Sequence, residues 1–245
     1  MARYQAILAY DGTDFQGFQR QSSVRTVQSV FEAALKLIGW QGKTVLAAGR
    51  TDTGVHATGQ VVAFDLEWQH SAKELVRALN ANLPPDVAVR SANEVRQEFH
   101  PRFSASSRRY RYRLFSDPVR HPLRERYAWR IWPEASLVPL EQAAKHLVGE
   151  HDFSAFGTPP RTGGSAVRRI FSARWSEAGP ELAFDISGNG FLYRMVRRLV
   201  HFQVEIAQGS RSMMELHDQL SGKNQGLVQG LAPAQGLHLM EVDYP

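Results

Sequence analysis

The chain has 245 residues, of which 43% are hydrophobic and 22% charged, a balance typical of a folded protein. It contains no cysteine, which excludes disulfide scaffolds, thiolate nucleophiles and cysteine-ligated zinc or iron–sulfur centres. The net charge of +5 rests on 24 arginines and only 5 lysines, and it favours an anionic partner because the planar guanidinium suits phosphate contacts.

The first hundred residues predict the element order βαββαβ. Strands are expected where apolar residues recur at strand spacing, over 4–10, 44–48, 60–66 and 87–92. Helices are expected at 27–38, capped by Thr26, and from Ser71 onwards, where Ser71 and Glu74 form a capping-box pattern. This order is that of the split-βαβ or ferredoxin-like unit.

The second half repeats this plan without obvious sequence identity to the first. Strands are expected at 108–114, 168–175, 181–187 and 236–242, and helices at 140–148, 191–207 and 213–220. A boundary within 93–107 would divide the chain into two lobes, residues 1–100 and 101–245. We therefore predict an α+β fold of two ferredoxin-like lobes with a catalytic cleft between them.

Two segments have a distinctive composition. Between Pro101 and Arg130 there are nine arginines and only two acidic residues, Asp117 and Glu125, so this segment is expected to be electropositive. Residues 157–165 hold paired prolines and glycines, which are equally consistent with a plain connector and with an RNA-gripping loop.

The stretch 48–57, AGRTDTGVHA, has the properties of an active-site loop. It places Arg50, Asp52 and His56 among glycines between two expected strands, so a rigid sheet would hold the carboxylate while the loop leaves it accessible. From spacing alone, an aspartate in this setting is more often a turn former whose carboxylate accepts backbone N–H bonds. His56 lacks metal-ligand partners at the usual spacing, which favours a structural histidine over a metal site.

Several motifs in a fixed order resemble the tRNA pseudouridine synthase A family. They comprise GRTDTGVHA at 49–57, YDG at 10–12 with GFQRQ at 17–21, NANLP at 80–84, FSA at 103–105 leading into RRYRY at 108–112, GFL at 190–192 with MVR at 195–197, and the ending VDYP. The resemblance spans essentially the whole chain. It implies the pseudouridine synthase fold and conversion of uridine to pseudouridine at positions 38, 39 and 40 of the tRNA anticodon arm, without a cofactor or a metal.

The resemblance also implies roles for particular residues. Asp52 corresponds to the catalytic aspartate, Tyr110 to the tyrosine placed against the target base, and Arg197 to an arginine of the MVR helix that would keep the carboxylate ionised by charge pairing. Arg50 could hold the space left when the uridine leaves the stack. Without the resemblance, Tyr110 would be read as core packing and Arg197 as a solvated arginine. RNA contacts are expected from three further arginines, Arg20, Arg108 and Arg109.

Two other functions compete with the isomerase. A catalytically silent tRNA-binding or chaperone protein could use the same scaffold, although binding alone would not require Asp52, Tyr110 and Arg197 together. A hydrolase using Asp52 and His56 would release free uracil, which isomerisation does not. The start of the chain has no apolar signal core and no apolar run is long enough to span a bilayer, so we expect a cytoplasmic protein, working on tRNA as a homodimer.

Overall fold

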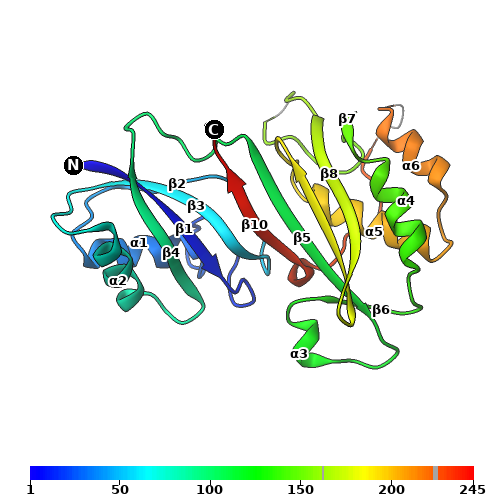
Figure 1. Ribbon diagram of the computed structural model, residues 1–245, viewed down its shortest axis with the longest axis horizontal. Helices are drawn as coiled ribbons and strands as arrows, with labels where there is room; N and C mark the ends of the chain where they lie inside the picture. The colour runs from blue at the N-terminus through cyan, green and yellow to red at the C-terminus, as the bar shows by residue number, and fades with distance from the viewer. Residues whose placement is uncertain (162, 223–225) are drawn as a thin grey trace. The chain divides into compact units, whose positions relative to one another are not determined.

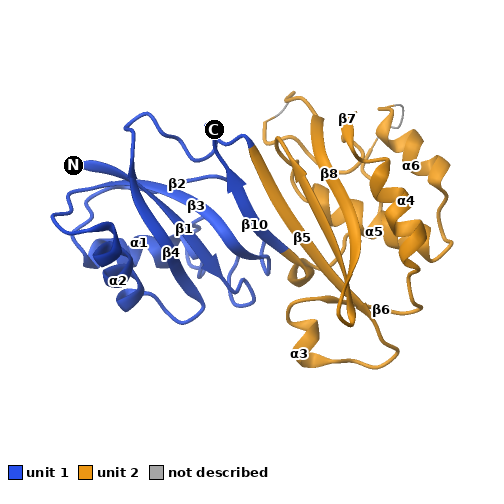
Figure 2. Ribbon diagram, in the orientation of Figure 1, with its two compact units in different colours: residues 1–106, 238–245 blue, residues 107–237 orange. Residues whose placement is uncertain are grey.

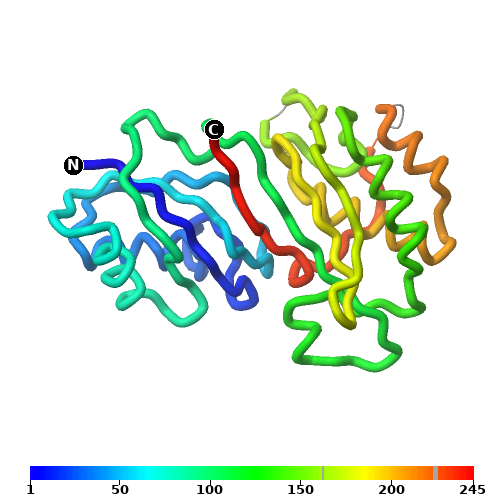
Figure 3. The backbone as a smooth tube through the Cα atoms, viewed as in Figure 1, coloured from blue at the N-terminus to red at the C-terminus, as the bar shows by residue number. Residues whose placement is uncertain are grey.

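The computed structural model of the chain describes residues 1–161, 163–222 and 226–245. Residues 1–106 and 238–245 form one compact unit, and residues 107–237 form a second (Figure 2). The backbone trace in Figure 3 shows the chain leaving the first unit after residue 106 and returning to it only with its last strand. No helix in the described ranges is long and apolar enough to cross a membrane.

The first unit is an antiparallel sheet with two helices and one added parallel strand (Figure 1). Its elements are β1 (Ala2–Tyr10), α1 (Val27–Leu37), β2 (Leu46–Ala47), β3 (His56–Leu66), α2 (Ala72–Asn82), β4 (Val87–Val95) and β10 (Leu237–Asp243). The strand order is β4-β1-β3-β10, and β2 also pairs with β3. Along one edge, β3 therefore pairs with β10 at its start and with β2 near its end.

The sequence pattern explains the core of this unit. Alternate residues of β1 are buried, among them Tyr4 and Leu8, as expected for a strand that covers the core with one face. Phe31 of α1 meets Phe64 of β3 edge to face, with ring centroids 5.8 Å apart, and Tyr4 stacks on the same phenylalanine at 6.1 Å. Burial of these aromatic rings is a large part of the driving force for packing the helix on the sheet.

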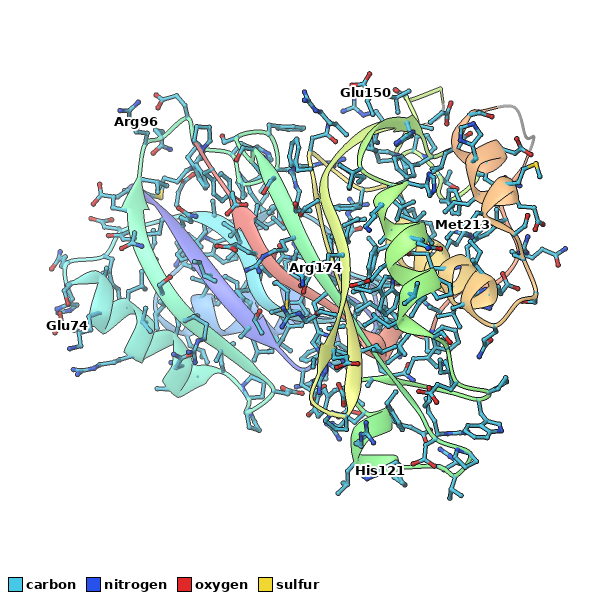
Figure 4. All side chains as sticks on the ribbon, turned by 45° about the vertical axis from the view of Figure 1, so that its right-hand side comes forward. Glu74, Arg96, His121, Glu150, Arg174 and Met213 are labelled. Atoms are coloured by element: carbon cyan, nitrogen blue, oxygen red, sulfur yellow. The ribbon has the colours of Figure 1, made fainter. Side chains whose placement is uncertain are left out.

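Both predicted N-caps of the first unit are present. The Thr26 hydroxyl accepts a hydrogen bond from the Ser29 N–H, and the Ser71 hydroxyl accepts one from the Glu74 N–H at 3.3 Å. Glu74, at the start of α2 (Figure 4), accepts in return from Ser71, and these hydrogen bonds lower the pKa of its carboxyl group. The helices begin where the capping residues indicate.

The second unit is a four-stranded antiparallel sheet with helices packed on it. Its elements are β5 (Ser107–Ser116), α3 (Pro122–Glu125), β6 (Trp129–Ile131), α4 (Leu137–Lys145), β7 (Gly149–Asp152), β8 (Val167–Ala178), β9 (Glu181–Gly188), α5 (Met195–Ala207), α6 (Met213–Leu220) and the 3-10 turn η1 (Ala234–Gly236). The order is β5-β9-β8-β7, and β6 adds a short parallel pairing to β5.

One aromatic cluster connects the sheet and the long helix of the second unit. Trp175 of β8 stacks on Phe184 of β9 with ring centroids 5.0 Å apart. Its indole N–H donates to the side-chain carbonyl of the fully buried Gln203 in α5, at 2.9 Å. A tryptophan so deeply buried needs a partner for its N–H, and the glutamine supplies it.

The structure differs from the sequence prediction at the domain boundary. The predicted second lobe, 101–245, includes the last strand, whereas β10 lies parallel to β3 with His238 opposite His56 and belongs to the first unit. The linker up to residue 106 also belongs there, since Ser106 N–H donates to the Asp243 carbonyl. Pairing between segments so far apart leaves no local trace in the sequence.

Smaller differences follow from backbone geometry. The strand predicted at 44–48 shrinks to two residues, and α5 begins at Met195 rather than at residue 191 because Arg194 takes a left-handed conformation, with φ of 62°. The short elements α3, β6 and β7 were not predicted. In the loop predicted at 157–165, Thr158 forms a β-bridge with Tyr193, while residue 162 lies outside the described residues.

A buried carboxylate of α1 connects the loop after β1 to the segment just before β2. Glu32 is only 2% exposed, and it accepts hydrogen bonds from Arg20 at 2.6 Å, from the Gln28 amide at 2.8 Å and from the Val45 N–H at 3.0 Å. Arg20 also donates to the Lys43 carbonyl. A carboxylate at such a depth needs hydrogen-bond donors of this kind.

Replacing Arg20 by alanine should therefore destabilise the protein. The Glu32 carboxylate would lose its cationic partner while staying buried, which we expect to lower the free energy of unfolding by about 1 to 2 kcal/mol, a figure reduced because Arg20 itself is half exposed. Urea denaturation measures the change. Arg96→Ala, at an exposed arginine of the same unit (Figure 4), is the matched control, and equal stability of the two variants would contradict the assignment.

Candidate active site

The loop predicted to carry the chemistry joins β2 to β3, and its entry is fixed to β3. The Ala48 N–H donates to the Val61 carbonyl at 2.8 Å. One residue on, the side-chain amide of the fully buried Gln60 donates to the Gly49 carbonyl at 3.0 Å. The backbone just before the arginine and aspartate is thereby attached to a central strand.

The middle of the loop is held on both sides of Asp52. Thr51 is buried, and its hydroxyl lies 2.8 Å from the hydroxyl of Tyr10 at the end of β1. After the aspartate, the Val55 N–H donates to the Asp52 carbonyl at 3.1 Å and closes a tight turn. Gly54 lies in this turn with φ of 78°, a conformation that favours glycine.

The loop that follows β1 packs against the aspartate loop backbone to backbone. The Phe18 N–H donates to the Thr51 carbonyl at 3.1 Å. A Cβ atom at Gly17 would lie 2.9 Å from the same carbonyl oxygen, and one at Gly12 would overlap the carbonyl of Val55. Only glycines permit this approach, so Gly12 and Gly17 determine how closely the two loops meet.

Asp52 and Arg50 differ in exposure, although they are two residues apart. Asp52 is half-buried, whereas Arg50 is exposed. The carboxylate is therefore partly exposed, on backbone that is fixed on either side. The geometry suits a group that must be held in position for a reaction at a sugar or a base.

His56, at the start of β3, occupies a structural position at the base of the loop. Its Nδ1 accepts from the Gly12 N–H at 3.0 Å, and its ring stacks on that of His238 with centroids 4.7 Å apart. Asp11 Oδ1 lies 3.2 Å from the same nitrogen. These contacts describe how His56 is packed, and its role as a structural histidine stays a prediction.

Tyr110 lies in the second unit, in the middle of β5. It is half-buried, and its ring meets the edge of the Phe191 ring at 85° with centroids 5.1 Å apart. Its strand neighbour Ile186 is buried in the core of the unit. The ring is thus held by packing at the margin of the core, where it keeps part of its surface accessible.

Arg197 lies in the first turn of α5. Its Nε donates to the Ala232 carbonyl at 2.8 Å, and the Ala232 N–H donates to the Arg197 carbonyl at 3.2 Å. The neighbouring Tyr112 is fully buried and donates to the Pro233 carbonyl; burial raises the pKa of its hydroxyl well above the usual value, and the charge of Arg197 lowers it in part. Arg197 is therefore a positioned cation rather than a solvated one.

The three arginines expected to contact RNA have different surroundings. Arg20 pairs with the buried Glu32, as described above. Arg108 donates to the Asn189 carbonyl at 2.8 Å, and Arg109 is half-buried on β5 opposite Ser187. Their contact with RNA stays a prediction.

The charge expected for residues 101–130 is largely balanced by acidic residues. Within the described residues, at least five of the nine arginines have carboxylate partners, namely Arg111 with Asp185, Arg113 and Arg124 with Glu181, and Arg120 and Arg130 with Glu125. Asp185 and Glu181 belong to β9, which pairs with β5, and Arg174 (Figure 4) lies opposite Asp185 on β8. The sequence window missed these acids because they are distant along the chain.

Sequence comparison identifies the class of protein to which this site belongs. The model of a family described as tRNA pseudouridine synthase matches residues 6–104 and 143–245. These ranges include the aspartate loop, the loop that holds it and Arg197, while Tyr110 falls between them. The chain belongs to the tRNA pseudouridine synthase family and is an isomerase of that class.

Curated relatives are similar over the full length of the chain. A protein of Limosilactobacillus fermentum named tRNA pseudouridine synthase A is 43% identical, with 100% of this chain and 96% of the relative covered. Proteins of the same name from Geobacter sp. and Shouchella clausii are 41% and 42% identical, covering 100% of this chain and 100% and 94% of the relatives.

Solved structures give a more distant similarity. A Cbf5-Nop10-Gar1 complex contains a chain that aligns with a TM-score of 0.34 and 10% identity, covering 82% of this chain and 54% of that one. An archaeal box H/ACA sRNP Nop10-Cbf5 complex gives a TM-score of 0.33, covering 83% and 53%. This chain thus spans about half the length of those two.

The contact at Gly12 gives a direct test of the loop geometry. Gly12→Ala must push the Val55 carbonyl away and so displace the turn that begins at Asp52. Because a displacement of about 1 Å at a reacting group can cost about 100-fold in rate, we expect a loss of pseudouridine formation of that order.

The control for this variant is Gly49→Ala in the same loop. A methyl group there meets no described atom within 4 Å, so activity should be nearly unchanged. Thermal denaturation of both variants shows whether each is folded at the assay temperature. Wild-type turnover by a folded Gly12→Ala variant would show that the close approach of the loops does not position the site.

Proposed function

We propose that the protein isomerises uridine to pseudouridine at positions 38, 39 and 40 of the tRNA anticodon arm. The observation that carries this proposal is the half-buried Asp52 on a loop that is hydrogen-bonded to β1, to β3 and to the loop following β1. The family and the names of the curated relatives support tRNA as the substrate. The choice of tRNA positions 38, 39 and 40 rests on the resemblance of the sequence motifs to those of the tRNA pseudouridine synthase A family.

The reaction breaks the bond between N1 of uracil and C1′ of ribose, turns the base, and forms a bond between C5 and C1′. C5 loses a proton and N1 gains one, so atoms and electrons balance without a redox partner. A carboxylate can assist by attacking covalently or by removing the proton, and we assign this role to Asp52. Both routes need an ionised group that is held close to the substrate.

We assign supporting roles to three further residues. Tyr110 stacks on the target base through a ring already held by Phe191, and we assign its hydroxyl to proton transfer. Arg197, fixed through the Ala232 carbonyl, is the cation of the site. Arg50, exposed beside Asp52, occupies the space left by the extruded nucleotide. We further propose that the protein acts as a homodimer in the cytoplasm, as the resemblance implies.

The decisive variant is Asp52→Asn, which removes the charge and the nucleophile while nearly preserving shape. Unmodified tRNA transcripts are incubated with purified protein and pseudouridine is mapped by position. We expect wild type to modify positions 38 to 40 and Asp52→Asn to form no product while still binding tRNA. Asp14→Asn, at an exposed carboxylate of the neighbouring loop, should retain activity.

The same experiment separates the competing functions. Activity of Asp52→Asn within about tenfold of wild type would remove Asp52 from the chemistry. Free uracil in the supernatant would indicate the hydrolase. Wild-type protein that binds tRNA and forms no pseudouridine would be the silent RNA-binding protein.

Salt dependence tests how the protein holds tRNA. Each phosphate contact releases counterions, so the logarithm of the binding constant should fall linearly with the logarithm of salt concentration, by roughly 0.7 to 0.9 per contact. Arg109→Ala should lower this slope by about one unit and weaken all tRNAs alike. Asp52→Ala should leave this slope unchanged, and so should Arg77→Ala, at an exposed arginine of α2. A binding constant that does not change with salt concentration would contradict an interface made of phosphate contacts.

A further inference from the structure

The turn from β9 into α5 is held rigidly by neighbouring backbone. Asn189 exchanges two hydrogen bonds with the Arg169 backbone, both 3.1 Å, and its carbonyl accepts from Arg108 at 2.8 Å. Further along, the Tyr193 N–H donates to the Thr158 carbonyl at 3.1 Å. The segment that leads into the helix is therefore fixed at both ends.

This rigid segment displays an aromatic ring and a cation together. Tyr193 is 53% exposed, and the Arg194 guanidinium lies over its ring, 4.8 Å from the centroid. Arg194 adopts φ of 62°, in the left-handed region that a residue with a side chain rarely adopts. Such conformations persist where the surroundings enforce them, and they cluster at functional sites.

Arg168 adds a partly buried positive charge beside the same turn. Its Nη1 donates to the Ser165 and Val167 carbonyls at 2.9 and 2.6 Å. Its Nε lies 3.8 Å from the position that a Cβ atom would take at Gly190. Burial lowers the pKa of its guanidinium, and no carboxylate pairs with it in the part of the chain that the structure describes. It differs in this from Arg111 and the other ion-paired arginines of the unit.

The position of these groups connects them to the site. Phe191, whose ring holds Tyr110, precedes Tyr193 by two residues, and Arg197 follows Arg194 within the first turn of α5. A tyrosine covered by a guanidinium is a suitable surface for stacking a nucleobase, and an arginine without an acidic partner is suited to a phosphate.

We propose that Tyr193 and Arg194 form a stacking platform for the base of a nucleotide next to the target uridine, and that Arg168 binds a phosphate of the same strand. This inference rests on the proposed function, because it presupposes that Tyr110 receives the target base. The platform holds the neighbouring base after the uridine has left the stack, so it contributes to binding and positioning rather than to the chemical step.

The test uses tRNA anticodon stem-loops with 2-aminopurine on either side of the target uridine. When wild type or Tyr193→Phe binds, stacking on the platform should quench the fluorescence of 2-aminopurine at one of these two positions. Tyr193→Ala should lose the quench and bind roughly 5- to 100-fold more weakly, as expected for loss of one stacked base. Trp132→Ala, at an exposed ring of the same unit, is the control and should behave as wild type.

Variants at two arginines make the test independent of a folding defect. Arg194→Gly suits the left-handed backbone, so its melting temperature should not fall although its affinity does. Arg168→Ala should lower the salt slope by about one unit, and Arg168→Lys should restore most of it.

The inference fails if Tyr193→Ala keeps the quench and an affinity within about twofold of wild type, or if Arg168→Ala keeps the full salt slope. The proposed function is judged separately by pseudouridine formation in the unlabelled stem-loop. If wild type isomerises normally and Tyr193→Ala keeps the wild-type quench and affinity, the stacking platform is overturned and the proposed function stands. If wild type does not isomerise the uridine, the proposed function is overturned.

Discussion

The candidate site depends on the backbone contact between two loops of the first unit. Glycines at positions 12 and 17 let the loop after β1 approach the carbonyls of Thr51 and Val55 more closely than any side chain would allow. The Phe18 N–H and the buried Thr51 hydroxyl then fix the residue that precedes Asp52. Preorganisation of this kind favours catalysis because no free energy is spent on ordering the carboxylate during the reaction.

Much of the local structure could be predicted from the sequence. Helices α1 and α2 begin where Thr26 and Ser71 indicate, and α6 has the predicted bounds, because capping and periodicity act over a few residues. The partner of β10 could not be predicted, since it pairs with a strand about 180 residues away, and such pairing depends on the whole fold. The late start of α5 depends on the left-handed Arg194, which no propensity would favour.

The candidate site, too, could be predicted only in part from the sequence. The aspartate loop and Tyr110 were recognisable as motifs, but the role of Gly12 as a contact point for Val55 becomes visible only in three dimensions. The positive charge predicted for the arginine-rich segment 101–130 was overestimated for a related reason. Its charge looked unbalanced along the chain, whereas strand pairing brings Asp185 beside Arg111 in a bidentate ion pair. Charge counts along a sequence therefore overestimate the surface that remains for RNA.

The central claim, that the aspartate loop is held in place before substrate binds, can be measured by amide hydrogen exchange in the free protein. The account predicts that the amides of Gly12, Phe18 and Val55, which donate to His56, Thr51 and Asp52, exchange about as slowly as those in the middle of β3. Exchange of these three amides at the rate of an unstructured loop, with β3 still protected, would contradict it.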